Sequence, residues 1–252
     1  MNGILVIDKE KNMTSRDVVN EVCKKIGTKH VGHTGTLDPI ATGVLILGVN
    51  EGCKIIELLT SNTKTYEAEI IVGLQTETLD VTGDILEDVK LDSLDYSFIK
   101  KVIDEFPRKY EQIVPIYSAL HVNGKRLYEY ARSGEEVDLP KRSVELYDLE
   151  LVGDIKKEEY FSFNIRTTVS KGTYIRSLIR DIGERLGIPC CMKELRRLKQ
   201  GIFDIENAIK LDDINENTKL ISIKNALSNY EKIVVDDDMI FKIRNGQVLK
   251  FD

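Results

Sequence analysis

The chain has 252 residues, of which 42% are hydrophobic and 31% charged, a globular composition that excludes a disordered, collagen-like or low-complexity protein. At about 150 residues per domain, this length allows one large domain or one domain with a small addition. The net charge of −6, taken alone, argues against a nucleic-acid partner. No apolar run is long enough to cross a membrane and the N-terminus does not resemble a signal peptide, so we expect a cytoplasmic protein.

Hydrophobic periodicity predicts alternating stretches of strand and helix. Strands are predicted over residues 3–8, 44–49, 65–73, 143–152 and 159–169. Helices are predicted after a capping-box sequence at 14–17, over 53–59, 95–106 and 173–186, and in a segment ending at Arg132. Most successive strands lack the long helix that a parallel crossover needs, which favours an α+β fold with a largely antiparallel sheet. The C-terminal residues are acidic and show only weak strand patterns.

Cysteine and histidine do not form a metal-binding pattern. The four Cys include no CxxC pair, and the three His are scattered at positions 30, 33 and 121. A structural zinc site is therefore not expected, and no metal is assigned. We interpret the cysteines as small buried residues of a protein in a reducing compartment.

Positive charge is concentrated late in the chain. Residues 171–200 contain eight Lys or Arg against three Asp or Glu, which gives this segment a local charge of +5. Binding of a polyanion depends on the local field, so a basic patch on an acidic protein is a credible nucleic-acid footprint. A solvated helix face explains the same charges equally well.

A loop rich in Gly, Pro and hydroxyl residues surrounds Asp38, over residues 32–43. Such a loop can hold a carboxylate rigidly at the floor of a cleft, but an ordinary tight turn with Asp38 as a cap has the same composition. The loop also approaches the phosphate-binding pattern GxxxxGK[ST]. His33 replaces the lysine of that pattern, and Gly35 and Pro39 break the helix that should follow, so a nucleotide triphosphate site is improbable.

A second candidate lies at the strand-to-helix junction of residues 170–177. Tyr174 and Arg176 fall in the first turn of the predicted helix, where a cation is unfavourable unless an anion lies nearby. The planar guanidinium suits a carboxylate or a phosphate, although an arginine facing solvent is the simpler reading. The nearby segment 195–197 is either a phosphate contact or part of an exposed edge.

Five sequence segments occur in an order that resembles the bacterial tRNA pseudouridine synthase B (TruB) family: GHTGTLDPIATGVL, KTYEAEI, GLQTETLDVTGDI, PIYSALHVNGKRLYEYARSG and SKGTYIRSLIRDIG. The resemblance covers about residues 3 to 203. It implies a pseudouridine synthase fold over residues 1–210, with a bent, mostly antiparallel mixed sheet, flanking helices and a central active-site cleft. It also implies that residues 211–252 are a tail resembling an incomplete RNA-binding domain of the PUA type.

The resemblance further implies the activity and the partners. The enzyme would isomerise the uridine at position fifty-five in the T loop of tRNA to pseudouridine, binding the T-arm and using no cofactor. Membrane association is not implied, and we expect a monomer because nothing suggests a coiled coil. The chemistry fits the residue types, since a carboxylate can act either as a nucleophile or as a base that abstracts a sugar proton.

Site residues follow from the same resemblance. Asp38 falls on the catalytic aspartate, with Asp80 and Arg176 in a charged network around it. Tyr66 falls on the tyrosine that stacks on the target base. Tyr174, His33 and Leu195 fall on positions that line the pocket or touch the flipped nucleotide. The basic stretch from Lys171 to Lys199, which includes Arg196 and Arg197, is predicted from its charge to hold the RNA backbone of the T-arm.

Two other functions share these motifs. One is a tRNA-binding or tRNA-folding protein that has lost catalysis, and the other is a related synthase with another RNA substrate. The retained carboxylates at 38 and 80 favour the enzyme, because pure RNA binding has no evident need for a charged carboxylate facing RNA. His121 stands where the family usually has a lysine, so the resemblance assigns it no RNA contact.

Overall fold

The computed structural model describes residues 1–60 and 63–248. Its strands are β1 (Gly3–Lys9), β2 (Val31–His33), β3 (Thr42–Val49), β4 (Lys64–Val72), β5 (Leu74–Thr76), β6 (Ile85–Asp88), β7 (Lys109–Ile113), β8 (His121–Val122), β9 (Lys125–Arg126), β10 (Lys141–Lys157), β11 (Phe161–Val169), β12 (Cys190–Gln200), β13 (Phe203–Asp204) and β14 (Ile209–Lys210). Its α-helices are α1 (Ser15–Ile26), α2 (Ile56–Thr60), α3 (Tyr96–Asp104), α4 (Leu127–Ser133), α5 (Ile175–Leu186), α6 (Ile223–Ala226) and α7 (Asp237–Arg244). Short 3₁₀ helices occupy Asn50–Ile55, Ile205–Asn207 and Leu211–Asp213.

One mixed sheet organises the molecule, with the strand order β14-β1-β3-β12-β4-β11-β10-β7. Strand β2 extends the sheet beside β3, and β13 pairs with β12. In the described part of the chain, β1 with β14 and β3 with β12 are parallel, and the other neighbours of this sheet are antiparallel. The predicted α+β class with a mostly antiparallel mixed sheet is confirmed.

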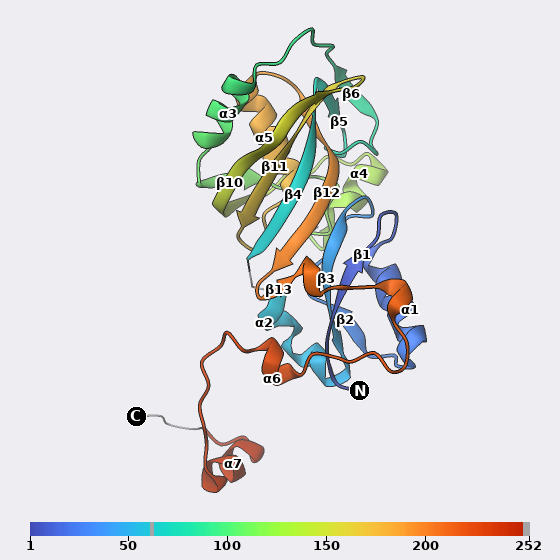
Figure 1. Cartoon of the computed structure of the whole chain (residues 1–252), viewed down its shortest axis with the longest axis vertical. Coiled ribbons are helices and arrows are strands. Elements are labelled where there is room, and N and C mark those ends of the chain that lie inside the picture. The colour runs from blue at the N-terminus through green and yellow to red at the C-terminus, as the bar shows by residue number, and fades with distance from the viewer. Residues whose placement is uncertain (61–62, 249–252) are drawn as a thin grey trace.

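Helices flank the sheet in two places. Helix α1 lies beside β1 and β2, while α3 and α5 lie behind the part of the sheet formed by β4, β10 and β11 (Figure 1). Helix α1 begins with the predicted capping box, in which the Thr14 side chain accepts from the Asp17 N–H, and it ends at Gly27 in the left-handed conformation. The main core joins these layers through residues such as Val18 on α1, Ile179 on α5 and Ile165 on β11.

The strands β14, β1 and β3 join the strands β12, β4, β11, β10 and β7 where β3 runs parallel to β12. Arg196 pairs with Thr42 and Arg197 with Gly43 in this short register. Gly43 has a φ of +99°, and a Cβ there would lie 2.2 Å from the carbonyl oxygen of Arg197. Only glycine lets the two backbones approach so closely. The junction also places the Asp38 loop, which precedes β3, against the middle of the sheet.

Strand β12 corrects the interpretation of residues 195–197 as an exposed edge. It lies in the interior of the sheet between β3 and β4, and its first three residues are buried. The charged residues of β12 make it look solvent-exposed in the sequence. The groups that pair with its arginines lie in distant segments of the chain, so the sequence near β12 does not indicate that the strand is interior.

The C-terminal residues first continue along the body and then leave it. Leu211 and Ile214 pack in the main core, and Ala226 packs in a second core cluster formed mainly by β1 and β3. In the described part of the last forty residues, 213–248, the weak strand patterns give way to helices α6 and α7 and an isolated β-bridge of Ile221 with Ile4. Helix α7 lies apart from the sheet (Figure 1). The division at residue 210 stays a prediction.

Candidate active site

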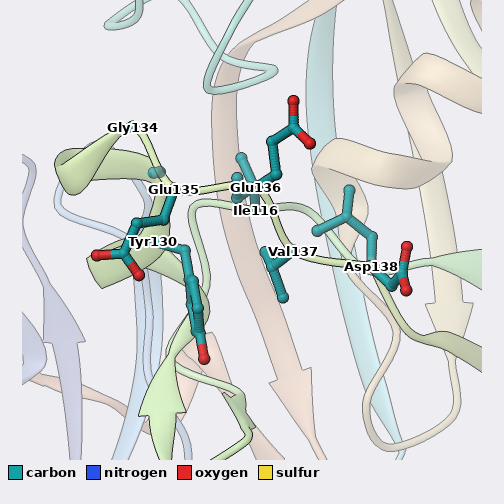
Figure 2. A pocket seen from close by; sticks show the side chains of 9 residues that line it. Ile116, Tyr130, Gly134, Glu135, Glu136, Val137 and Asp138 are labelled. Carbon is teal, nitrogen blue, oxygen red and sulfur yellow. The ribbon is translucent and has the colours of Figure 1, made fainter.

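Two cavities in the described part of the chain differ in charge. The first, of about 720 Å³, lies beside α4 and has the carboxylates of Glu135, Glu136 and Asp138 around it (Figure 2). Lys and Arg are absent from the described residues that line it. We call it the acidic cavity, and its charge is unfavourable for a polyanion.

The second cavity, of about 580 Å³, has the opposite balance. Among the described residues that line it, Asp38 is the one acid, and the cations are Lys64, Arg142, Lys171, Arg176 and Arg197. We call it the Asp38 cavity. One carboxylate in a cationic depression suits a reaction on a polyanionic substrate, so this cavity is the candidate active site.

Arg176 joins the two predicted acids, as the motif implies. Its Nε lies 2.9 Å from Asp38 Oδ2, and its Nη1 lies 3.9 Å from Asp80 Oδ2. The side chains of Arg176 and Asp80 are each 7% exposed, whereas that of Asp38 is 34% exposed and lines the cavity. Asp80 therefore lies behind the arginine, and Asp38 is the acid that a substrate can reach.

Both groups behind Asp38 are held by further hydrogen bonds. Arg176 donates to the carbonyl oxygens of Thr78 at 2.8 Å and Tyr117 at 2.9 Å. Asp80 accepts from the Thr78 hydroxyl at 2.9 Å and from the backbone N–H of Thr82 at 3.0 Å. Arg176 is also the second residue of α5, where the positive helix end disfavours a cation, and the two carboxylates offset that cost. The guanidinium is thus fixed before any substrate binds.

A buried glutamine fixes the helix that carries Arg176. Tyr174 is the N-cap residue of α5, and no side-chain cap comes from Tyr174 itself. Its backbone N–H instead donates to Gln112 Oε1 at 2.8 Å, while Gln112 Nε2 donates to the Tyr110 hydroxyl at 2.8 Å. Burial raises the pKa of Tyr110, so its hydroxyl stays protonated. Gln112 of β7 therefore holds the N-terminus of α5 in place through this hydrogen bond.

The Asp38 loop is tied to the first helix and the first strand. The N–H of Leu37 donates to Ser15 Oγ at 2.9 Å. Lys9, which is 0% exposed, donates to the carbonyl oxygens of Glu10, Met13 and Pro39. Burial lowers the pKa of Lys9 to about 8, an effect that the nearby Asp38 partly opposes. The backbone on both sides of Asp38 is thereby held in place.

Tyr66 is buried and lines the cavity, with Arg197 behind it. The guanidinium carbon of Arg197 lies 6.0 Å from the centroid of the Tyr66 ring, and Nη1 lies 3.5 Å from the hydroxyl. Arg197 is 1% exposed, and its Nε donates to the Val44 carbonyl at 2.6 Å. Protein groups contact this guanidinium, and Arg197 also belongs to the lining of the Asp38 cavity, so its predicted contact with the RNA backbone stays a prediction.

The other predicted substrate contacts divide into two groups. Tyr174, Leu195 and Lys171 line the Asp38 cavity. Arg196 does not line it, and its guanidinium forms a two-pronged pair with Asp8 at 3.0 and 2.7 Å. The Arg196 side chain is still 41% exposed, and its predicted contact with the RNA backbone stays a prediction.

His33 also falls outside the cavity lining. At this residue β2 still pairs with Leu47 of β3, and the cavity wall begins at Thr34. Burial lowers the pKa of His33, and the positive charges of Arg16 and Arg197 lower it further, so its imidazole is held neutral. His33 therefore lies next to the residues that line the cavity, and its predicted contact with the flipped nucleotide stays a prediction.

Three residues of the site were missed by sequence reasoning: Lys64, Arg142 and Gln112. Lys64 and Arg142 line the cavity, and Gln112 anchors α5. For Lys64, the signal was its place two residues before Tyr66 in the KTYEAEI segment. For Arg142 and Gln112 no local pattern points to the site, because both reach it only through the pairing of β7 with β10.

Comparisons with known proteins identify the class. Residues 23–175 match the model of the TruB family pseudouridylate synthase N-terminal domain, and residues 176–236 match that of the tRNA pseudouridylate synthase B C-terminal domain. Among solved structures, a chain of a Cbf5-Nop10-Gar1 complex superposes with a TM-score of 0.63 at 30% identity. It aligns with 84% of this chain and 53% of its own length. The fold is that of the pseudouridine synthases, which are isomerases.

Curated relatives place the chain within that class. It is 43% identical to tRNA pseudouridine synthase B of a Bacillus cereus strain, over 99% of this chain and 85% of the relative. The protein of the same name from Bacillus subtilis is 41% identical, over 99% of this chain and 84% of the relative. The chain belongs to the TruB family of pseudouridylate synthases.

Membrane-spanning helices and metal-binding clusters are both absent from the described residues. No helix in residues 1–60 and 63–248 is long and apolar enough to span a membrane. The same residues contain no group of three or more His, Cys, Asp or Glu placed to hold a metal ion. All four cysteines are free, Cys190 and Cys191 buried and the other two half-buried.

Proposed function

We propose that this chain isomerises the uridine at position fifty-five in the T loop of tRNA to pseudouridine, with Asp38 as the catalytic carboxylate. The observation that carries the proposal is the position of Asp38, an acid in a cationic cavity with Arg176 Nε at 2.9 Å. The relatives named tRNA pseudouridine synthase B support tRNA as the substrate.

The reaction needs a carboxylate and no cofactor. The N1–C1′ bond breaks, the base turns, and C5 joins C1′, while the C5 proton leaves and N1 takes up a proton. No electrons are gained or lost overall. Asp38 acts either as a nucleophile on the sugar or as a base that abstracts a sugar proton. In both cases Arg176 orients the carboxylate and Asp80 orients Arg176.

In this proposal the Asp38 cavity receives one nucleotide turned out of the T loop. A stacked base cannot reach Asp38, so the enzyme must extrude it. Tyr66 and Tyr174 then supply aromatic surfaces, and Leu195 supplies apolar contact, all from the cavity wall. Stacking on such a ring contributes about 1–3 kcal/mol per base. This binding offsets the cost of unstacking the uridine.

The proposal is tested by tritium release from unmodified tRNA labelled at uridine C5. Wild type should release tritium, and Asp38→Asn should not, while it still binds tRNA. Asp138→Asn is the matched control, because it changes a carboxylate of the acidic cavity, and it should keep the wild-type rate.

A tRNA with cytidine at position fifty-five tests the position and should give no release. Appreciable turnover by Asp38→Asn would show that another group is the catalytic carboxylate. Binding without release by wild type would instead favour a tRNA-binding protein without catalysis, and release from a different RNA would favour a synthase with another substrate.

A further inference from the structure

Arg142 differs from the other arginines near the Asp38 cavity. Arg176 and Arg196 pair with carboxylates, and Arg197 donates to protein carbonyls. Arg142 is half-buried and lines the cavity, yet among the described residues its side chain has neither a hydrogen bond nor an ion pair. Its guanidinium therefore keeps its donors available on the substrate side of the fold.

The backbone of the neighbouring loop is shaped around this guanidinium. Gly172 has a φ of +87°, and a Cβ there would lie 3.0 Å from Arg142 Nη1. The guanidinium thus lies against the loop of residues 170–173, which also contributes Lys171 to the cavity lining. Two cations from different elements, β10 and the β11–α5 loop, meet at one wall.

Arg142 and Lys171 bring two positive charges to this wall. Lys64 lines the same cavity, and its pKa falls to about 8 through burial and through the positive charges of Arg197 and Lys171. Asp38, the acid of the lining, is already engaged by Arg176. The planar donors of arginine match two phosphate oxygens, and a lysine adds a point charge.

We propose that Arg142 and Lys171 form a subsite for an RNA backbone phosphate next to the extruded uridine. The inference rests on the proposed function, because extruding a nucleotide brings its own phosphates to the cavity mouth. Of the backbone contacts predicted from the sequence, this subsite keeps Lys171, and it adds Arg142.

The first test is the salt dependence of binding to unmodified tRNA, measured in the Asp38→Asn background so that the RNA is not converted. Arg142→Ala should weaken binding about tenfold or more and reduce the slope of log Kd against log salt by about 1. Arg142→Lys should restore the slope, because it restores the charge. Arg142→Gln, which keeps a long polar side chain, should behave like the alanine variant if charge is the cause.

Arg185→Ala is the matched control. Arg185 is exposed in the last turn of α5, with its guanidinium 5.0 Å from the Phe106 ring, and is not part of the Asp38 cavity. Its removal should leave the affinity and the slope unchanged. An unchanged slope in both Arg142→Ala and Arg142→Gln would overturn the subsite.

The second test locates the phosphate. T-arm stem-loop RNAs carry one uncharged methylphosphonate on either side of the target uridine, and their binding to the Asp38→Asn protein is compared with and without the further substitution Arg142→Ala. Neutralising the contacted phosphate should weaken binding when Arg142 is present and have little further effect in the Arg142→Ala protein. If, at both phosphate positions, the loss of affinity from the methylphosphonate is the same with and without Arg142→Ala, the two effects are independent and the subsite is overturned. Failure of the wild type to release tritium would overturn the proposed function, whichever way the binding result falls.

Discussion

Arg166 and Arg176 each face two carboxylates, in very different surroundings. Arg166 on β11 lies opposite Glu67 of β4 and Glu150 of β10, on the solvent face of the sheet. Its side chain is 43% exposed, whereas that of Arg176 is 7% exposed. Water screens the first group, and the second depends on protein contacts for its solvation. The same side-chain chemistry therefore serves as a surface pair in one place and as the support of the candidate catalytic acid in the other.

The largest effect is expected from Arg176→Met. Removing one partner of a buried pair leaves Asp80 uncompensated, which should lower the free energy of unfolding by about 3–5 kcal/mol. Turnover should be lost as well, because Asp38 loses its orienting group. Urea unfolding and tritium release measure the two effects.

A double variant separates these effects. Arg176→Met with Asp80→Asn removes the uncompensated charge, so it should recover part of the stability but none of the turnover. A single variant as stable as wild type would contradict the description of Arg176 and Asp80 as an interdependent buried pair.

Lys9 extends the comparison to a buried cation whose close contacts are carbonyl oxygens. Its pKa falls from 10.5 to about 8 on folding because burial disfavours the ammonium form. Between these two values the unfolded chain holds more protons than the folded one, so the Lys9 contribution to stability rises as pH increases. The stability of wild type relative to Lys9→Met should therefore grow across this window and stay level below pH 8.

The difference between the two proteins is the quantity to measure, by urea unfolding at several pH values. The pKa values of Cys190 and Cys191 are raised to about 12 by burial, which lowers stability as pH rises above their ordinary value of 9.0. Lys64, with a pKa of about 8, acts in the same direction as Lys9. These groups are common to both proteins and cancel. A difference that is flat with pH would mean that Lys9 does not titrate in this range.

The sequence predicted most of the framework because its patterns are local. The capping box of α1, the alternation of β4 and the amphipathic period of α5 each lie within a dozen residues, and all three elements form as predicted. Strand β12 was missed for the opposite reason. Its run of Lys, Glu and Arg looks solvent-exposed until Asp8 and the Val44 carbonyl, both more than 150 residues earlier in the chain, supply partners.

The site shows the same division. The motifs brought Asp38, Asp80 and Arg176 together correctly, because their geometry is part of the family resemblance. The backbone contacts were assigned from local charge density, which counted Arg196 and Arg197 as free. Charge density cannot distinguish a paired arginine from an available one, and Arg142 carries no local pattern that marks it as available.

The smallest effect is expected on the solvent face. Arg166→Ala should change the free energy of unfolding by no more than about 1 kcal/mol, because exposed ion pairs gain little over their hydrated separated charges. The effect should shrink further in high salt, which screens Glu67 and Glu150 from each other. Tritium release should stay at the wild-type rate, and Arg166→Lys should be nearly silent in both assays. A loss as large as that of Arg176→Met would mean that cross-strand pairing, rather than burial, determines the contribution of these arginines.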